Sequence, residues 1–184
     1  AVLEDDGTPA NGISRLRSAN GTFETTDFTN PTGSVTINRG NAADTLTVSS
    51  LPDFDAALTV GTAANPFSTI TFTGATTLAS NKNLTAFATG QISLPNAASD
   101  LATSGTGTIS LTTARNISMS SGSSLSTVDG DLTLQANQPN PPTNGGFVGI
   151  DVNAATVIST GSGNVLLEGR GGNGGGGNVG VQVQ

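Results

Sequence analysis

The passage Leu101-Ala-Thr-Ser-Gly-Thr-Gly107 recurs as Leu125-Ser-Thr-Val-Asp-Gly-Asp131 and again as Ile158-Ser-Thr-Gly-Ser-Gly-Asn164. Each copy joins a short apolar and hydroxyl-bearing stretch to a turn of small polar residues. The copies begin 24 and 33 residues apart. Recurrence at such intervals is the mark of a repeat architecture, in which each repeat is one supersecondary unit. The chain is therefore expected to fold as a stack of similar units.

Apolar-polar-apolar triplets run along the whole chain, usually with Thr or Ser in the middle. This alternation of period two predicts short strands with one buried face. The triplets form two interleaved series, which begin at Val35, Leu58, Leu84, Ile109, Leu132 and Val165 and at Leu46, Ile70, Ile92, Ile117, Ile150 and Val181. A third apolar position follows the second series at Phe54, Leu78, Leu101, Leu125 and Ile158.

Three short strands per coil of about 24 residues predict an all-β fold, a right- or left-handed parallel β-solenoid (β-helix). Stacked coils would line Val, Ile and Leu into one interior column. The alternative is an antiparallel sandwich, whose strands recur every 8 to 12 residues. A sandwich does not explain why the amino-acid sequence itself repeats. Helices are not expected, because the chain has three glutamates and a single lysine, Lys82.

The repeat suggests how the chain is organised. Residues 1–34 fit it poorly and are expected to form an N-terminal cap or an irregular coil, whereas residues 35–184 form the solenoid. Insertions at 135–149 and 168–180 fall at one corner of neighbouring coils, so they should lie side by side. Such insertions are the usual place for binding, although loop growth is also tolerated at little cost. The candidate contact residues in these loops are Asn140, Asn144, Phe147, Arg170, Asn173 and Asn178.

Composition excludes several classes of function. Six basic residues against thirteen acidic ones give a net charge of -7, which argues against nucleic acid as a partner. No apolar run exceeds three residues, so membrane insertion is not expected. The chain has no cysteine and no histidine, which removes thiol chemistry and the commonest general base. Absence of cysteine also suits an exported bacterial chain, so we expect an extracellular or cell-surface location.

Metal and catalytic chemistry find little support. The segment Arg39-Gly-Asn-Ala-Ala-Asp-Thr-Leu46 resembles a degraded copy of a glycine-aspartate calcium repeat, and Asp44 is the one weak calcium candidate. The matching passage one coil later has no carboxylate, which favours a simple turn aspartate. In the expected stacking Asp151 aligns with Ser93 and Ser118, so no acidic column forms for cleaving polysaccharides. We therefore expect no catalytic residue, no bound metal and no cofactor.

Several phrases resemble the repeats of giant bacterial surface proteins, the filamentous-haemagglutinin-like and haemolysin-type-repeat adhesins. Examples are Phe28-Thr-Asn-Pro-Thr32, Ser34-Val-Thr-Ile-Asn38 and Asp44-Thr-Leu-Thr-Val48. The resemblance implies a non-enzymatic, secreted structural or adhesive segment, with surface glycans among its potential partners. The alternative function is a carbohydrate-binding or polysaccharide-cleaving β-helix module.

The last strand suggests self-association. Val179, Val181 and Val183 alternate with Gly and Gln, and no further coil in the sequence follows them. The chain begins without Met and stops inside this strand, so we expect it to be a fragment. An open solenoid end recruits another strand. We expect another copy, or a neighbouring segment of the same parent chain, to continue the ladder into a filament.

Overall fold

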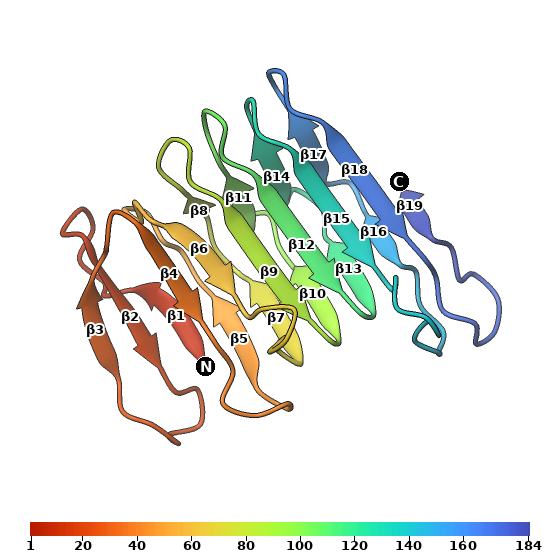
Figure 1. Ribbon diagram of the computed structural model, residues 1–184, viewed down its shortest axis with the longest axis horizontal. Helices are drawn as coiled ribbons and strands as arrows, with labels where there is room; N and C mark the ends of the chain where they lie inside the picture. Colours follow the sequence, from red (N-terminus) through yellow and green to blue (C-terminus); the bar gives the residue numbers. More distant parts are fainter.

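A computed structural model describes all of residues 1–184, and strands and turns make up the whole chain without a helix. Three sheets wind around one axis, and parallel neighbours along each sheet lie one coil apart in the sequence. The result is an elongated rod with the two termini toward opposite ends (Figure 1). The expected parallel β-solenoid is thereby confirmed.

The first triplet series builds a six-stranded parallel sheet, called here the first sheet. Leu84, Ile109, Leu132 and Val165 stack in successive coils, as the repeat predicts. Its strands are β4 (Ser34–Ile37), β6 (Ala57–Val60), β9 (Leu84–Ala88), β12 (Ile109–Thr113), β15 (Leu132–Ala136) and β18 (Val165–Gly169).

The second series builds the parallel part of a nine-stranded sheet, the second sheet. Ile92, Ile117, Ile150 and Val181 stack there, again as predicted. Its parallel strands include β5 (Thr45–Val48), β7 (Thr69–Phe72), β10 (Gln91–Leu94), β13 (Asn116–Met119), β16 (Ile150–Val152) and β19 (Val181–Val183).

The third sheet has four strands, and here the predicted register needs correction. Leu125 pairs with Val157 and not with Ile158, which points outward and is exposed. The turn before this strand is one residue shorter than in the preceding coil, and a shift of one residue turns every side chain to the other face. The strands are β8 (Thr76–Thr77), β11 (Asp100–Ala102), β14 (Ser124–Thr127) and β17 (Thr156–Ser159).

Two residues of the third apolar series are buried but do not pair in the third sheet. Phe54 and Leu78 are both in the core, as expected for apolar side chains of this series. The paired positions, however, are taken by Leu51 and Thr76, which form an isolated bridge. Thr76 also aligns with Leu101 in β11. The early coils therefore place their third apolar side chain a few residues beyond the paired segment.

The N-terminal residues extend the second sheet with three strands paired antiparallel in order, called here the N-terminal hairpin. β1 (Val2–Asp5) lies parallel to β5, and β2 (Ile13–Arg17) and β3 (Thr26–Thr29) follow it antiparallel. Two ion pairs bridge these strands: Arg17 Nε lies 2.6 Å from Glu4 Oε1, and Arg15 Nε lies 2.7 Å from Asp27 Oδ1. Opposite charges on facing strands favour this pairing over a slipped one.

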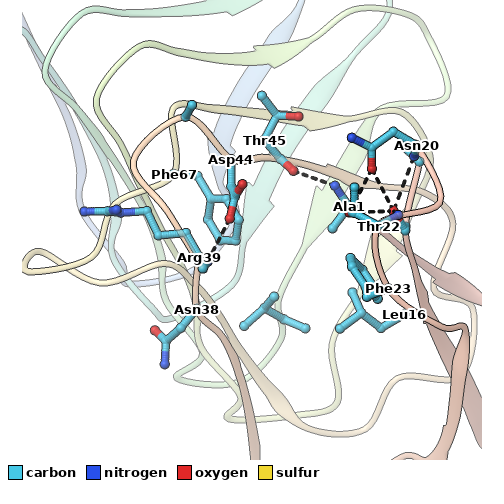
Figure 2. Close-up of a pocket in the computed structure, with 15 residues that line it drawn as sticks. Ala1, Leu16, Asn20, Thr22, Phe23, Asn38, Arg39, Asp44, Thr45 and Phe67 are labelled. Carbon is cyan, nitrogen blue, oxygen red and sulfur yellow. Dashed lines mark hydrogen bonds between the residues drawn. The ribbon is translucent and has the colours of Figure 1, made fainter.

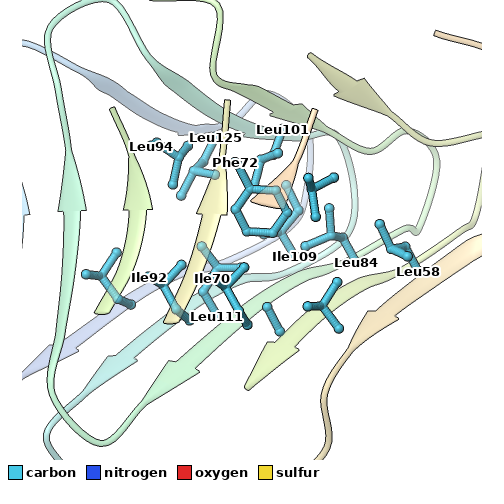
Figure 3. Close-up of a cluster of buried hydrophobic side chains, with 14 of the residues drawn as sticks. Leu58, Ile70, Phe72, Leu84, Ile92, Leu94, Leu101, Ile109, Leu111 and Leu125 are labelled. Atoms are coloured by element: carbon cyan, nitrogen blue, oxygen red, sulfur yellow. The ribbon is translucent and has the colours of Figure 1, made fainter. Parts of the chain in front are cut away.

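The interior is one column of aliphatic and aromatic side chains along the rod. Figure 3 shows part of it, with Leu58, Leu84 and Ile109 from the first sheet facing Ile70 and Ile92 from the second. The cluster contains 29 buried residues. Full burial of one such side chain contributes roughly 1.5–3 kcal/mol, so stacked coils supply the core that a single coil lacks.

A row of glycines marks the corner that leads into the first sheet. A side chain at Gly130 would collide with the carbonyl oxygen of Gly107, and one at Gly163 would collide with that of Gly130. Coils can stack closely at this corner only because the three positions carry no Cβ. The glycines that sequence analysis read as ordinary turn residues are therefore packing residues.

Candidate functional site

The two predicted insertions lie side by side at the C-terminal end of the rod. The backbone N–H of Gly172 donates to the carbonyl of Phe147 (3.0 Å), and that of Gly174 donates to Gly145 (2.8 Å). Side chains at Gly172 would overlap the backbone of Gly145. The glycine-rich loop is therefore shaped to pack against its neighbour.

Most of the predicted contact residues make contacts within the chain, either between the two loops, within one loop or with Arg115. Asn173 Nδ2 donates to Asn144 Oδ1 (2.9 Å), and Asn178 Nδ2 donates to the Gly175 carbonyl (2.9 Å). Phe147 lies under the guanidinium of Arg115, with 4.9 Å between the guanidinium carbon and the ring centre. Asn140 and Arg170 are exposed and their side chains form no hydrogen bond within the chain. The loops thus form a braced surface, in which Asn140 and Arg170 have free side chains.

Asn137 anchors both loops, and sequence analysis missed it. Its side chain is fully buried. Its Oδ1 accepts a hydrogen bond from the Thr143 N–H (2.6 Å), and its Nδ2 donates to the carbonyl of Gly171 (3.2 Å). Its backbone has a φ of 57°, a conformation that Asn tolerates better than most residues. An asparagine directly after the strand β15 was the available signal.

Asp44, the calcium candidate, closes a turn. Its Oδ2 accepts hydrogen bonds from the backbone N–H groups of Gly40 and Asn41, both at 2.8 Å. These donors hold the pKa of the Asp44 carboxyl below its usual range, with the Asn41 N–H contributing most. No group of three or more Asp, Glu, His or Cys side chains is arranged to hold a metal ion.

At the glycine corner, side-chain oxygens of one coil receive backbone N–H groups of the next coil. Asn83 Oδ1 accepts from the Thr108 N–H (3.0 Å), and Asp131 Oδ1 accepts from the Asn164 N–H (2.8 Å). We call these residues, which immediately precede a first-sheet strand, the corner clasps. Asn164 holds the same position before β18. Its Nδ2 donates back to Asp131, but its own Oδ1 has no partner.

The last coil exposes its interior side chains. Val183 is 70% exposed, whereas Val152, which occupies the same interior position one coil earlier, is 3% exposed. Val165 is 45% exposed, above a completely buried Leu132. Each of β17, β18 and β19 has one unpaired edge. This end of the rod is a template on which another strand can pair and another apolar side chain can pack.

A cavity of about 620 Å³ lies at the opposite end, between the N-terminal hairpin and the first coil. Figure 2 shows Leu16, Phe23 and Asn20 on one side of it and Arg39 and Asp44 on the other. Small-molecule sites typically measure about 300–1,000 Å³. Its size and its two-sided lining make it the candidate ligand site of this chain.

Both apolar and polar groups face this cavity. Phe67 and Ile37, which belong to the core, supply the apolar lining together with Leu16 and the half-exposed ring of Phe23. The polar lining includes Asn20, Thr22 and Asp44, and the Ala1 ammonium, which donates to the Thr45 carbonyl (2.7 Å). Sequence analysis did not find this site, because the hairpin loop and the turn at 38–45 meet only in the folded chain.

Comparisons with protein families, with curated proteins and with solved structures find no significant match to this chain. No helix here is long and apolar enough to cross a membrane.

Proposed function

We propose that this chain is a non-enzymatic structural segment of a large extracellular bacterial surface or matrix protein, in which solenoid coils stack into a fibre. The observation that carries the proposal is the uncovered last coil, with its three open strand edges and the exposed Val183 and Val165. Unpaired edges and exposed core positions favour the addition of another strand. The occupant we propose is a neighbouring coil of the same parent chain.

The corner clasps support this occupant. Asn83 and Asp131 each accept an N–H from the coil that follows them. Asn164 stands at the equivalent position with its Oδ1 unused. A parallel coil of the same kind would place a backbone N–H there, and its first strand would pair with β18. The last coil thus has an acceptor as well as an apolar surface for the next one.

The N-terminal hairpin limits which partner fits. If the β4 strand of a second complete copy paired with β18, the copy's β1, β2 and β3 would fall at the level of β19, β16 and β13 in the second sheet. Those places are occupied. Direct head-to-tail stacking of complete copies therefore needs the hairpin to leave the sheet, whereas a neighbouring coil without a hairpin stacks freely. An antiparallel terminal hairpin is one way in which β-proteins protect an edge.

Extension of the chain tests the proposal. Because β19 aligns with β13 through β16, a copy of residues 121–152 placed after Gln184 continues the coil in register. Nearest-neighbour interfaces supply much of the stability of repeat proteins, so the thermal midpoint of the extended chain should rise by several degrees. The matched control carries Asp in place of the copied Leu125 and Leu132, and should melt like the parent. Equal midpoints for the extended chain and this control would refute the proposal.

A substitution at the unused clasp sharpens the test. Asn164→Ala should lower the midpoint of the extended chain more than that of the parent, because only the extended chain gives the Asn164 Oδ1 a backbone donor. If Asn164→Ala lowers the thermal midpoint equally in the parent and in the extended chain, Asn164 stabilises the chain only through its hydrogen bonds with Asp131.

A further inference from the structure

We infer that Asn20, in the loop between β2 and β3, is an acceptor for N-linked glycosylation. The sequence Asn20-Gly-Thr22 has the acceptor pattern, in which Ser or Thr stands two residues after an asparagine and the residue between them is not proline. The substrate class is an activated sugar, joined through its anomeric carbon to the phosphate of a carrier. This loop lies at the opposite end of the rod from the last coil, so the site is independent of the proposed coil stacking (Figure 1).

The acceptor pattern occurs three times, and only one copy lies wholly in an exposed loop. The other two begin at Asn83 and Asn116. Asn116 is buried in β13, which pairs with β10 on one side and β16 on the other. The copy at Asn83 runs into β9, which pairs with β6 and β12. A transferase must hold the backbone around its acceptor, and the backbone groups of these two strands already bond their neighbours.

The loop around Asn20 has the opposite character. Residues 19–27 are all exposed, and residues 18–25 belong to no strand. Gly21 has a φ of 73°, and no atom from elsewhere in the chain lies within 4 Å of the place where its Cβ would be. Surface loops of this kind are where modifying enzymes gain access to a folded chain.

The hydrogen bonds of the loop leave the reacting atom of Asn20 free. Its Oδ1 accepts from Ser18 Oγ (2.8 Å) and from Thr22 Oγ1 (2.9 Å), and Figure 2 shows Asn20 and Thr22 together. Two donors on the carbonyl oxygen hold the amide in one orientation. Its Nδ2, the atom that would receive the sugar, forms no hydrogen bond within the chain. The hydroxyl that the pattern requires is therefore the one that orients the acceptor amide.

The transfer step needs from this chain only the acceptor amide. A bond forms between Asn20 Nδ2 and the anomeric carbon of the sugar, and the bond from that carbon to the donor's phosphate oxygen breaks. The electron pair of the broken bond leaves with the phosphate, and one amide proton passes to a base of the transferase. Nucleotide sugars and sugars on a lipid pyrophosphate share this chemistry, and both yield a bulky polar group on the loop.

Tryptic mass mapping of the folded chain tests the inference, because cleavage after Arg and Lys places the three copies in the separate peptides 18–39, 83–115 and 116–170. One arm uses UDP-glucose with an asparagine-specific glycosyltransferase, and the other a lipid-pyrophosphate oligosaccharide with an oligosaccharyltransferase. In at least one arm the 18–39 peptide should gain a sugar ~10-fold faster than the other two, which need a strand to open first. The arm that works identifies the donor. Synthetic peptides of residues 14–28, 77–91 and 110–124, which have no sheet to open, should differ less.

Two substitutions at one position give matched variants. Thr22→Ala should abolish the mass increase of the 18–39 peptide, whereas Thr22→Ser should retain it, because the hydroxyl is what the pattern requires. Both changes lie in an exposed loop, so both variants should melt like the parent. Three outcomes would overturn the inference: no sugar on the 18–39 peptide in either arm, equal rates for all three peptides of the folded chain, and full modification of the Thr22→Ala variant.

Discussion

The Asp131 carboxylate accepts a hydrogen bond of 2.8 Å from the backbone N–H of Asn164, which lies one coil further along the chain. Asp129 does the same for Ser162 at 3.0 Å. Two acidic side chains that could be mistaken for a functional pair thus hold one coil onto the next. The same corner uses Asn83 for this purpose two coils earlier, where the acceptor is uncharged.

The charged clasps make stability depend on pH. Hydrogen bonds from Ser162 and Asn164 lower the pKa of Asp129 and Asp131 below the ordinary value of 3.8. The unfolded chain therefore takes up protons first as the pH falls, so the stability from these carboxylates is complete above 3.8 and is lost below it. The double variant Asp129→Asn, Asp131→Asn should show a shallower decline of thermal midpoint in this acid range.

The uncharged clasp gives the control for this prediction. Asn83→Ala should lower the midpoint by the same amount at about pH 3 as at about pH 7, because an amide does not titrate. If the double Asn variant and the parent decline in parallel, the hydrogen bonds at Asp129 and Asp131 do not govern the acid sensitivity.

Ile117 tests the interior assignment. It is completely buried and stacks between Ile92 and Ile150. Ile117→Asp should cost several kcal/mol or more of unfolding free energy, because a charge there has no partner. Ser93→Asp changes an outward position whose neighbours in the adjacent coils, Thr71 and Ser118, are uncharged, and should cost less than about 1 kcal/mol. Urea denaturation measures both, and similar losses for the two variants would mean that the faces are assigned wrongly.

Gly130 tests the close stacking at the corner. A methyl group there meets the backbone of Gly107. Gly130→Ala should destabilise the chain by about 1–3 kcal/mol, the usual cost of overpacking. Gly33→Ala is the matched control, because nothing lies near its added methyl group and its φ is not positive. That variant should be neutral or slightly stabilising, and a neutral Gly130→Ala would contradict the structure.

Calcium should have no effect on stability. Asp44 already accepts two backbone N–H groups, and no further carboxylate lies with it in the turn. Melting curves with a chelator and with millimolar calcium should therefore coincide. A rise of several degrees with calcium would point to a bound ion, since a ligand that binds only the folded state raises the midpoint.

The hairpin should keep isolated copies from polymerising. Sedimentation of the complete chain at tens of micromolar should show no series of head-to-tail oligomers, because β1, β2 and β3 would collide with the second sheet of the next copy. Deletion of residues 1–29 exposes the β5 edge and should allow larger assemblies. Long polymers of the complete chain would show that the hairpin leaves the sheet readily.

The repeat in the sequence predicts the strands of residues 35–184, their order and the stacking of the first two sheets, but it does not predict the three N-terminal strands. Period-two alternation is a local property of the sequence. The repeat spacing then predicts that Ile92 stacks on Ile117 and Leu132 on Val165, as the structure has them. It failed at Ile158, where one residue fewer in a turn placed Val157 inside instead. Turn length is not visible in alternation, yet it decides which face a strand buries.

Other features depend on contacts that exist only in the folded chain. The glycine at 130 is indistinguishable in sequence from a turn glycine, and its role depends on the carbonyl of Gly107 one coil away. Asn137 reads as a loop residue, but it is buried between two loops that are far apart in the sequence. Phe23 and Arg39 line one cavity because an antiparallel hairpin folds beside the first coil. These features depend on contacts made by loops, turns and the N-terminal strands. Those segments do not follow the regular repeat, so the repeat spacing cannot predict which of them meet.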